Sequence, residues 1–266
     1  MAARLENRAK HPFFRGVIAD YIGDLEPERI EHALEIGCGT GVVSRSLAAA
    51  PGFRGTIAAT DMSPYLIEAA RRHAAEEGVG ASIAFAVASA TALHAGDGVY
   101  DLVIAHTLFS HAADPVAILK ECARVLRPDG RLLIFDRDFA SSALSLDKDV
   151  AAKIDIADVS RAFAAQPCIM RELPRLFAEM GFAIESHRAY VIADVGRADF
   201  FAENLSTWRR LLPVSGVVGK EAADLLMDNL DAASAAGTLF WANNFYTFIA
   251  RKTGRAAARR SGTDRS

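Results

Sequence analysis

Short apolar runs alternate with helical patterns between Leu34 and about Leu133. The runs are almost continuously aliphatic, which is typical of strands covered on both faces. Pro64 and Pro115 follow Ser63 and Asp114, so each stands at the favoured first position of a helix. We expect strands at 33–36, 56–60, 82–87, 101–105 and 131–135, separated by helices at 41–50, 64–77 and 115–126. Such alternation predicts an α/β fold with a mostly parallel sheet and helices on both faces.

The regular alternation of short apolar runs and helical patterns ends after Phe135. Further elements are expected as a weak helix at 149–164, a helix at 171–180, a strand at 182–193, a helical stretch at 198–235 and a last strand at 239–251. We interpret residues 1–254 as one domain, with a core at about 30–136, 168–195 and 238–252. Two segments, about 136–167 and 198–235, are surplus to that core and are expected to form helical cap insertions. The basic, Ala/Gly/Ser-rich tail at 255–266 is expected to be disordered.

Composition narrows the class of protein. The chain has 266 residues, is 51% hydrophobic and 24% charged, and carries a formal net charge of -3. This balance is ordinary for a globular enzyme and gives no argument for nucleic acid or an anionic membrane as a partner. Cys38, Cys122 and Cys168 lack C-x-x-C spacing, so we expect neither a disulfide framework nor a metal site. The chain shows neither a signal-peptide segment nor a run of roughly 18 apolar residues, and a cytoplasmic location is the default expectation.

The stretch LEIGCGTG, beginning at Leu34, places three glycines where a strand should end and a helix begin. Glycine at such a turn lets a ligand lie directly against the main chain. Asp61 follows Gly41 by 20 residues, at the end of the next expected strand. A carboxylate there can accept hydrogen bonds from both ribose hydroxyls of an adenosine-containing ligand. A dinucleotide motif would need a third glycine where Val42 stands, and a P-loop would need a lysine that this turn lacks.

The residues E-I-G-C-G-T-G resemble the first motif of the class I S-adenosylmethionine-dependent methyltransferases. YDLVIAHTLFSHAADP and CARVLRPDGRLLI resemble the fourth strand and the turn into the fifth strand of the same family. Within it, the chain is similar to the ubiquinone/menaquinone-biosynthesis-like group (methyltransferase type 11/25). The resemblance implies a Rossmann-like, seven-stranded, mostly parallel sheet with an antiparallel last strand. It also implies S-adenosylmethionine as the cofactor and S-adenosylhomocysteine as its product.

The resemblance assigns roles around that cofactor. Glu35 would organise the region of the methionine ammonium, Asp61 would hold the ribose, and Met62 would cover one face of the adenine. Ser89, followed by Ala90, stands where many relatives carry an acid that contacts the adenine amino group. The remaining residues implied beside the cofactor are Gly37, Cys38, Gly39, Gly41 and His106.

The acceptor is expected at the carboxyl ends of the fourth and fifth strands, where open parallel sheets bind ligands. His106 and His111 are candidate catalytic bases, because a neutral imidazole can remove a proton near physiological pH. The alternative for His106 is that it only packs or hydrogen-bonds near the methionine end of the cofactor. The expected substrate-pocket residues are Phe109, Arg137, Asp138, Trp208, Trp241 and Asn244. The simpler alternative for the aromatic residues is burial between helix faces.

The sequence therefore predicts methyl transfer from S-adenosylmethionine to a small organic molecule by in-line displacement. It does not distinguish oxygen, nitrogen and carbon acceptors, because the activated sulfonium requires chiefly positioning. A nucleobase acceptor is disfavoured, since the loop after the fourth strand reads Ala-His-Thr-Leu instead of Asn/Asp-Pro-Pro-aromatic. Two other readings stay open: an NAD(P)-dependent oxidoreductase and a non-catalytic S-adenosylmethionine-binding partner protein. The oligomeric state stays open, and a homodimer is one option.

Overall fold

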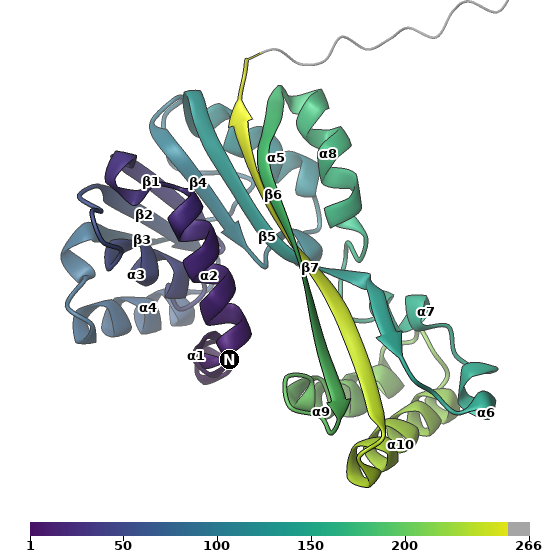
Figure 1. Ribbon diagram of the computed structural model, residues 1–266. Coiled ribbons are helices and arrows are strands. Elements are labelled where there is room, and N and C mark those ends of the chain that lie inside the picture. Colours follow the sequence, from purple (N-terminus) through teal and green to yellow (C-terminus); the bar gives the residue numbers. More distant parts are fainter. Residues whose placement is uncertain (255–266) are drawn as a thin grey trace, which may run out of the picture.

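A computed structural model describes residues 1–254 of the protein (Figure 1). The expected disordered tail at 255–266 lies outside the described residues. At the centre is a seven-stranded sheet with the strand order β3-β2-β1-β4-β5-β7-β6. The strands are β1 (His32–Ile36), β2 (Thr56–Asp61), β3 (Ile83–Val87), β4 (Tyr100–His106), β5 (Leu126–Leu144), β6 (Phe182–Gly196) and β7 (Leu239–Lys252).

Among these seven strands, β7 alone runs in the direction opposite to the others. The pairs β1–β2, β2–β3, β1–β4 and β4–β5 are parallel, whereas β7 is antiparallel to both β5 and β6. The predicted Rossmann-like sheet with an antiparallel last strand is therefore confirmed. The carboxyl ends of β1, β2 and β4 meet at one edge, which is where such sheets bind ligands.

Two hydrophobic clusters explain why the strands are aliphatic on both sides. Along β4, Leu102 and Ile104 belong to one cluster, and Val103 and Ala105 belong to the other. Successive residues of a strand point to opposite faces, so a sheet with helices on both faces needs apolar residues at every position. The first cluster packs against α2, α3 and α4, and the second packs against α5 and α8.

The helices of the core begin where the sequence predicts. The Ser63 hydroxyl accepts a hydrogen bond from the Leu66 amide, and the Asp114 carboxylate accepts one from the Ala117 amide at 2.8 Å. The described α-helices are α1 (Ala2–Lys10), α2 (Pro12–Asp24), α3 (Val42–Ala48), α4 (Pro64–Glu76), α5 (Pro115–Val125), α6 (Lys148–Ala151), α7 (Ile156–Arg161), α8 (Ile169–Met180), α9 (Ala202–Leu211) and α10 (Lys220–Ala236). Short 3-10 turns lie at Pro27–Arg29, Gly80–Ser82, Phe109–His111 and Leu212–Val214.

The segments expected to form a cap differ from the prediction in detail. β5 continues nine residues beyond Phe135 to Leu144 because that segment pairs with β7, from Asp136 opposite Tyr246 to Leu144 opposite Trp241. The long strands β5, β6 and β7 thus extend past the rest of the sheet and carry α6, α7, α9 and α10 at their far end (Figure 1). The single helical stretch expected at 198–235 is two helices, because Pro213, Gly216 and Gly219 lie between α9 and α10.

Two N-terminal helices are absent from the sequence-based assignment. α2 buries Phe14, Val17, Ile18, Tyr21 and Ile22, a spacing typical of one helix face. α1 precedes it and lies at the end of the sheet where β1 and β2 finish (Figure 1). Among residues 1–254, no helix combines the length and the apolar character needed to cross a bilayer.

Candidate functional site

The glycine loop between β1 and α3 is held against the end of β2. Asp61 accepts a hydrogen bond from the Gly39 amide through Oδ2 and one from the Ser63 amide through Oδ1, both at 2.9 Å. Gly41 has a φ of +76°, and a Cβ there would lie 2.8 Å from the Phe85 ring. A side chain at this position is therefore excluded both by its backbone angle and by its neighbour.

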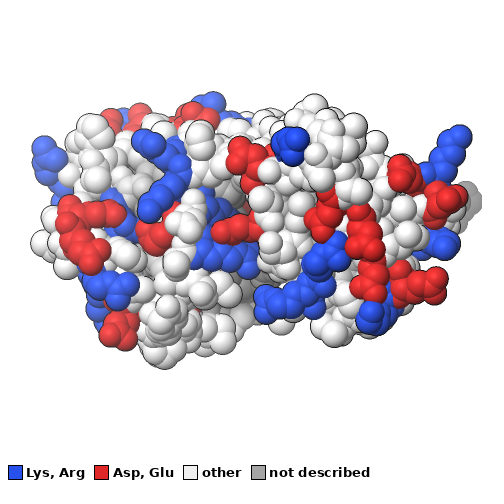
Figure 2. Space-filling view, turned by 90° about the horizontal axis from the view of Figure 1, so that it is seen from below, with Lys and Arg blue, Asp and Glu red and all other residues white. Residues whose placement is uncertain are grey.

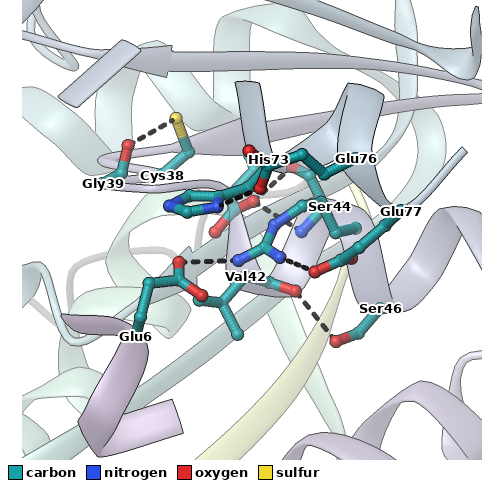
Figure 3. Close-up of polar contacts among 11 residues, drawn as sticks. Glu6, Cys38, Gly39, Val42, Ser44, Ser46, His73, Glu76 and Glu77 are labelled. Atoms are coloured by element: carbon teal, nitrogen blue, oxygen red, sulfur yellow. Dashed lines mark hydrogen bonds and ion pairs between the residues drawn. The ribbon is translucent and has the colours of Figure 1, made fainter. Parts of the chain in front are cut away.

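Glu35, at the end of β1, is buried beneath this loop. Its Oε2 accepts hydrogen bonds from the Ser44 amide at 2.8 Å and from the Ser44 hydroxyl. Burial raises the pKa of the Glu35 carboxyl to about 7, and the nearby Asp61 charge adds to the shift. The neighbouring guanidinium of Arg45 does not neutralise Glu35, because it pairs with Glu6 of α1 at 2.7 Å and with Glu77 after α4. Glu6 and Glu77 approach that guanidinium from opposite sides (Figure 3).

A cavity of about 280 Å³ opens above the loop, and we call it the glycine-loop cavity. Of the residues predicted to surround a cofactor, Glu35, Gly37, Cys38, Gly39, Asp61 and His106 line it. α1 and α2 form its other wall through Leu5, Arg8, Phe14 and Ile18.

Four of the predicted cofactor residues lie outside the glycine-loop cavity. Gly41 faces Phe85 instead, and the Met62 side chain is 74% exposed. The Ser89 hydroxyl is hydrogen-bonded to that of Thr91 at 2.8 Å, and Ala90 packs against the cluster on the α5 and α8 face. These residues do not line the cavity, and a role for Met62, Ser89 or Ala90 toward an adenine stays a prediction.

A second cavity, of about 380 Å³, lies between α1, the extended part of β5, α9 and β7. We call it the aromatic cavity because six aromatic side chains line it: Phe14, Phe139, Phe163, Phe200, Trp208 and Phe245. Arg137, Trp208 and His111 are the predicted acceptor-site residues that the structure brings here. The two cavities share Arg8, Phe14 and Thr107, so they meet at the end of β4.

Four predicted pocket residues do not line the aromatic cavity, and a role for them toward an acceptor stays a prediction. Phe109 is buried in the hydrophobic cluster on the α5 and α8 face. Asp138 is buried and pairs with Arg171 at 2.8 Å. Trp241 is fully buried and stacks on Phe201, so the simpler reading, burial between packed elements, holds for it. Asn244 does not line the cavity, whereas its neighbour on β7, Phe245, does. Successive residues of a strand point to opposite faces of the sheet, so the two side chains lie on different faces.

The two candidate bases have different surroundings. The His106 Nδ1 lies 3.0 Å from the Tyr21 hydroxyl, and its ring stacks on Phe135. Burial, together with the Arg8 charge, lowers the pKa of His106 to about 3. His106 is therefore neutral at physiological pH, but such a low pKa makes it a weak base.

His111 lines the aromatic cavity, edge-on to Phe139. Burial lowers the pKa of His111, and the positive charges of Arg8, Arg137 and Arg4 lower it further, while Asp136 opposes them. His111 is thus the candidate base that faces the larger cavity.

The part of the site that sequence reasoning missed is supplied by α1. Arg4, Asn7, Arg8 and His11 from α1 and its end line the aromatic cavity. These positions recur at helical spacing, and the apolar positions of α2 directly follow them. This spacing in the sequence predicts an amphipathic helix at this end of the chain.

Comparisons with known proteins agree with this geometry. Residues 34–134 match the protein family described as a methyltransferase domain. The chain is 38% identical over 101 residues to the ubiquinone biosynthesis O-methyltransferase of Parvibaculum lavamentivorans, covering 38% of each protein. It is 29% identical over 225 residues to a 37.1 kDa protein in transposon TN4556 of Streptomyces fradiae, covering 84% of this chain and 63% of that one. The chain thus spans less than two thirds of the length of either relative.

The fold is also found among solved structures. The YcgJ protein of Bacillus subtilis superposes with a TM-score of 0.62 at 16% identity, over 90% of this chain and 98% of that one. The expected fold is confirmed, and the expected match to a methyltransferase domain is confirmed for residues 34–134.

Proposed function

We propose that this chain, whose residues 34–134 form a methyltransferase domain, transfers a methyl group from S-adenosylmethionine to a small organic molecule. The observation that carries the proposal is the junction of two cavities at Thr107. One is built by the glycine loop with Asp61 and Glu35, and the other is walled by aromatic side chains. A donor in the first cavity and an acceptor in the second would meet at the end of β4.

The donor would be held by residues of the glycine-loop cavity. A carboxylate offers about four lone-pair sites, so Asp61 can hold the Gly39 and Ser63 amides and still accept from ribose hydroxyls. Glu35 lies under the loop, where its charge would favour the methionine ammonium. Met62 is exposed beside Asp61, so that a purine ring could pack against it.

The reaction would depend mainly on positioning. The sulfonium supplies an already activated methyl group, and the protein has to align the acceptor and exclude water. The aromatic walls of the second cavity serve both tasks. His111 faces that cavity and would accept a proton where the acceptor must lose one, while His106 would fix the end of β4 through its contact with Tyr21.

Further parts of the proposal concern the cap and the assembly. The segments at about 136–167 and 198–235 contribute Phe139, Phe163 and Trp208 to the aromatic cavity, which supports a role as a cap over the acceptor. A homodimer is compatible with this arrangement, and a nucleic-acid acceptor is not favoured.

Two experiments test the proposed function. Calorimetry should show binding of S-adenosylmethionine and S-adenosylhomocysteine but not of NAD, because Val42 opens α3 where a dinucleotide motif needs glycine. Incubation with methyl-labelled S-adenosylmethionine and a metabolite extract should then transfer label to a small molecule. Tight NAD binding without S-adenosylmethionine binding would refute the cofactor, and binding without transfer would indicate a non-catalytic binding protein.

A further inference from the structure

Two arginine side chains face the aromatic cavity without an acidic partner: Arg137, which is buried, and Arg8, which is partly buried. Arg8 of α1 and Arg137 of β5 both line it. Within residues 1–254, no carboxylate oxygen lies within the 4.0 Å ion-pair distance of either side chain. Burying a cation without a partner is costly, so an unpaired buried arginine needs an explanation.

Arg45 provides a matched comparison elsewhere in the same chain. Arg45 and Arg137 are each 6% exposed, yet Arg45 is held between the carboxylates of Glu6 and Glu77. Arg137 instead donates to the Asn243 side chain and lies over the Phe139 ring, 4.5 Å from its centre, while its Nε is buried without a hydrogen-bond partner. Its position is therefore fixed by neutral groups, and its charge is left free to act on the cavity.

Arg8 is positioned in a similar way. Its guanidinium lies 4.4 Å from the centre of the Phe14 ring, at the place where the two cavities meet. Burial lowers the pKa of Arg8 to about 10 and that of Arg137 to about 9, so both remain charged at neutral pH.

The acids around the cavity do not cancel these two charges. Asp136 is the buried one, and its oxygens already accept hydrogen bonds from the Ser110 amide, the Ser110 hydroxyl and the Arg137 amide. Glu203 pairs with Arg4 at 3.5 Å, and Asp199 is exposed. Asp138 is also buried and acts on Arg137, but it is already paired with Arg171 at 2.8 Å. Asp136 is then the buried carboxylate left against Arg8 and Arg137, and a monoanion would balance the remaining positive charge.

The face of the molecule in Figure 2 shows no such concentration of one sign. On the face seen from below, Lys and Arg side chains are interspersed with Asp and Glu (Figure 2). The excess charge lies inside a cavity of about 380 Å³, near the lower end of the volumes typical of small-molecule sites. A small ligand suits this site better than a polyanion.

On the basis of the proposed function, we infer that the methyl acceptor is a small carboxylic acid with an aromatic or apolar body. Arg8 and Arg137 would bind its carboxylate, and the aromatic walls would enclose its body. The atom to be methylated would be a different one, directed toward Thr107, where the glycine-loop cavity begins.

The test compares matched acid and amide probes. Dissociation constants of 3-phenylpropionate, 3-phenylpropanamide and phenyl phosphate are measured by calorimetry, with and without saturating S-adenosylhomocysteine. We expect the acid to bind at least roughly tenfold more tightly than the amide, because hydrogen bonds to a charged group are stronger than neutral ones. Equal binding of acid and amide would overturn the inference, and tight binding of phenyl phosphate without binding of the acid would overturn the carboxylate assignment.

Variants identify the residues responsible. Arg8→Met and Arg137→Met should each abolish the preference for the acid, whereas Lys10→Met should retain it, because Lys10 is exposed on α1 and lines neither cavity. Circular dichroism verifies folding, and if Arg137→Met does not fold, Arg8→Met alone decides. An unchanged preference in a folded Arg8→Met protein would overturn the assignment.

The titration with S-adenosylhomocysteine separates this inference from the proposed function. Cofactor-product binding without a preference for the acid would overturn the inference and leave the proposed function standing. A preference for the acid without cofactor-product binding would support the anion site and overturn the proposed function.

Discussion

The raised pKa of Glu35 predicts that cofactor binding depends on pH. Glu35 lines the glycine-loop cavity, and its pKa of about 7 compares with an ordinary value of 4.5. A folded-state pKa above the unfolded value means that the folded protein binds the extra proton. The contribution of protonated Glu35 to the free energy of unfolding is therefore fully present below pH 4.5 and is lost as the pH rises through 7. Ionised Glu35 then costs about 3 kcal/mol, which a bound ammonium group would offset.

The size of the effect follows from the ionised fraction. If the cofactor ammonium binds beside the carboxylate, it binds the ionised form, so the affinity rises with pH. With a pKa of about 7, roughly 3% of Glu35 is ionised at pH 5.5 and roughly three quarters at pH 7.5. We therefore expect S-adenosylhomocysteine to bind roughly twentyfold more weakly at pH 5.5 than at pH 7.5.

Calorimetry in two buffers of different ionisation enthalpy measures the linked proton directly. At pH 6, binding to the wild-type protein should release close to one proton. The Glu35→Gln variant should show neither the release nor the pH dependence. Glu77→Gln is the matched control, because Glu77 also belongs to the polar network around Arg45 but lines neither cavity. Wild-type affinity that is flat between pH 5.5 and 7.5, or proton uptake on binding, would refute the placement of the ammonium beside Glu35.

Three further outcomes are expected. Asp61→Ala should weaken cofactor binding by about 2–4 kcal/mol, and unchanged affinity in calorimetry would refute the ribose contact. The same variant should lower the melting temperature, because Asp61 also holds the Gly39 and Ser63 amides. Trp241→Ala should lower the free energy of unfolding in urea by about 3–5 kcal/mol, since Trp241 is fully buried between Phe201 and Trp208; a loss below about 1 kcal/mol would contradict this packing. The folded-state pKa of His106 lies below its unfolded value, so the stability that neutral His106 contributes is present above pH 6.5 and is lost as the pH falls. At pH 5 the loss in the free energy of unfolding should be about 2 kcal/mol. The pH-dependent difference between wild type and His106→Asn isolates this contribution from the opposite one of Glu35, and parallel curves would show that His106 is not buried as described.

The core could be predicted from the sequence because its signals are local. Buried parallel strands are aliphatic at every position, as in β4, and proline after a capping residue marks the starts of α4 and α5. The glycine loop is equally local, since the positive φ of Gly41 favours glycine whatever lies beside it. The extension of β5 to Leu144 could not be read in this way. It depends on pairing with β7, about a hundred residues later in the chain.

The acceptor site was harder to predict for the same reason. Which residues of β7 face the cavity depends on the register between β5 and β7, and one residue of register decides between Asn244 and Phe245. Trp241 looks the same in sequence whether it lines a pocket or stacks in the core. Arg8 lies on a helix whose apolar partner, α2, was not recognised, so the residue shared by both cavities was overlooked. Its significance comes only from comparing charges that lie far apart in the sequence. Arg45 is buried with two carboxylate partners, whereas Arg8 and Arg137 face the aromatic cavity and form no ion pair within residues 1–254. The charge that we propose for the acceptor therefore depends on the folded chain, whereas the proposed donor site depends on one short motif.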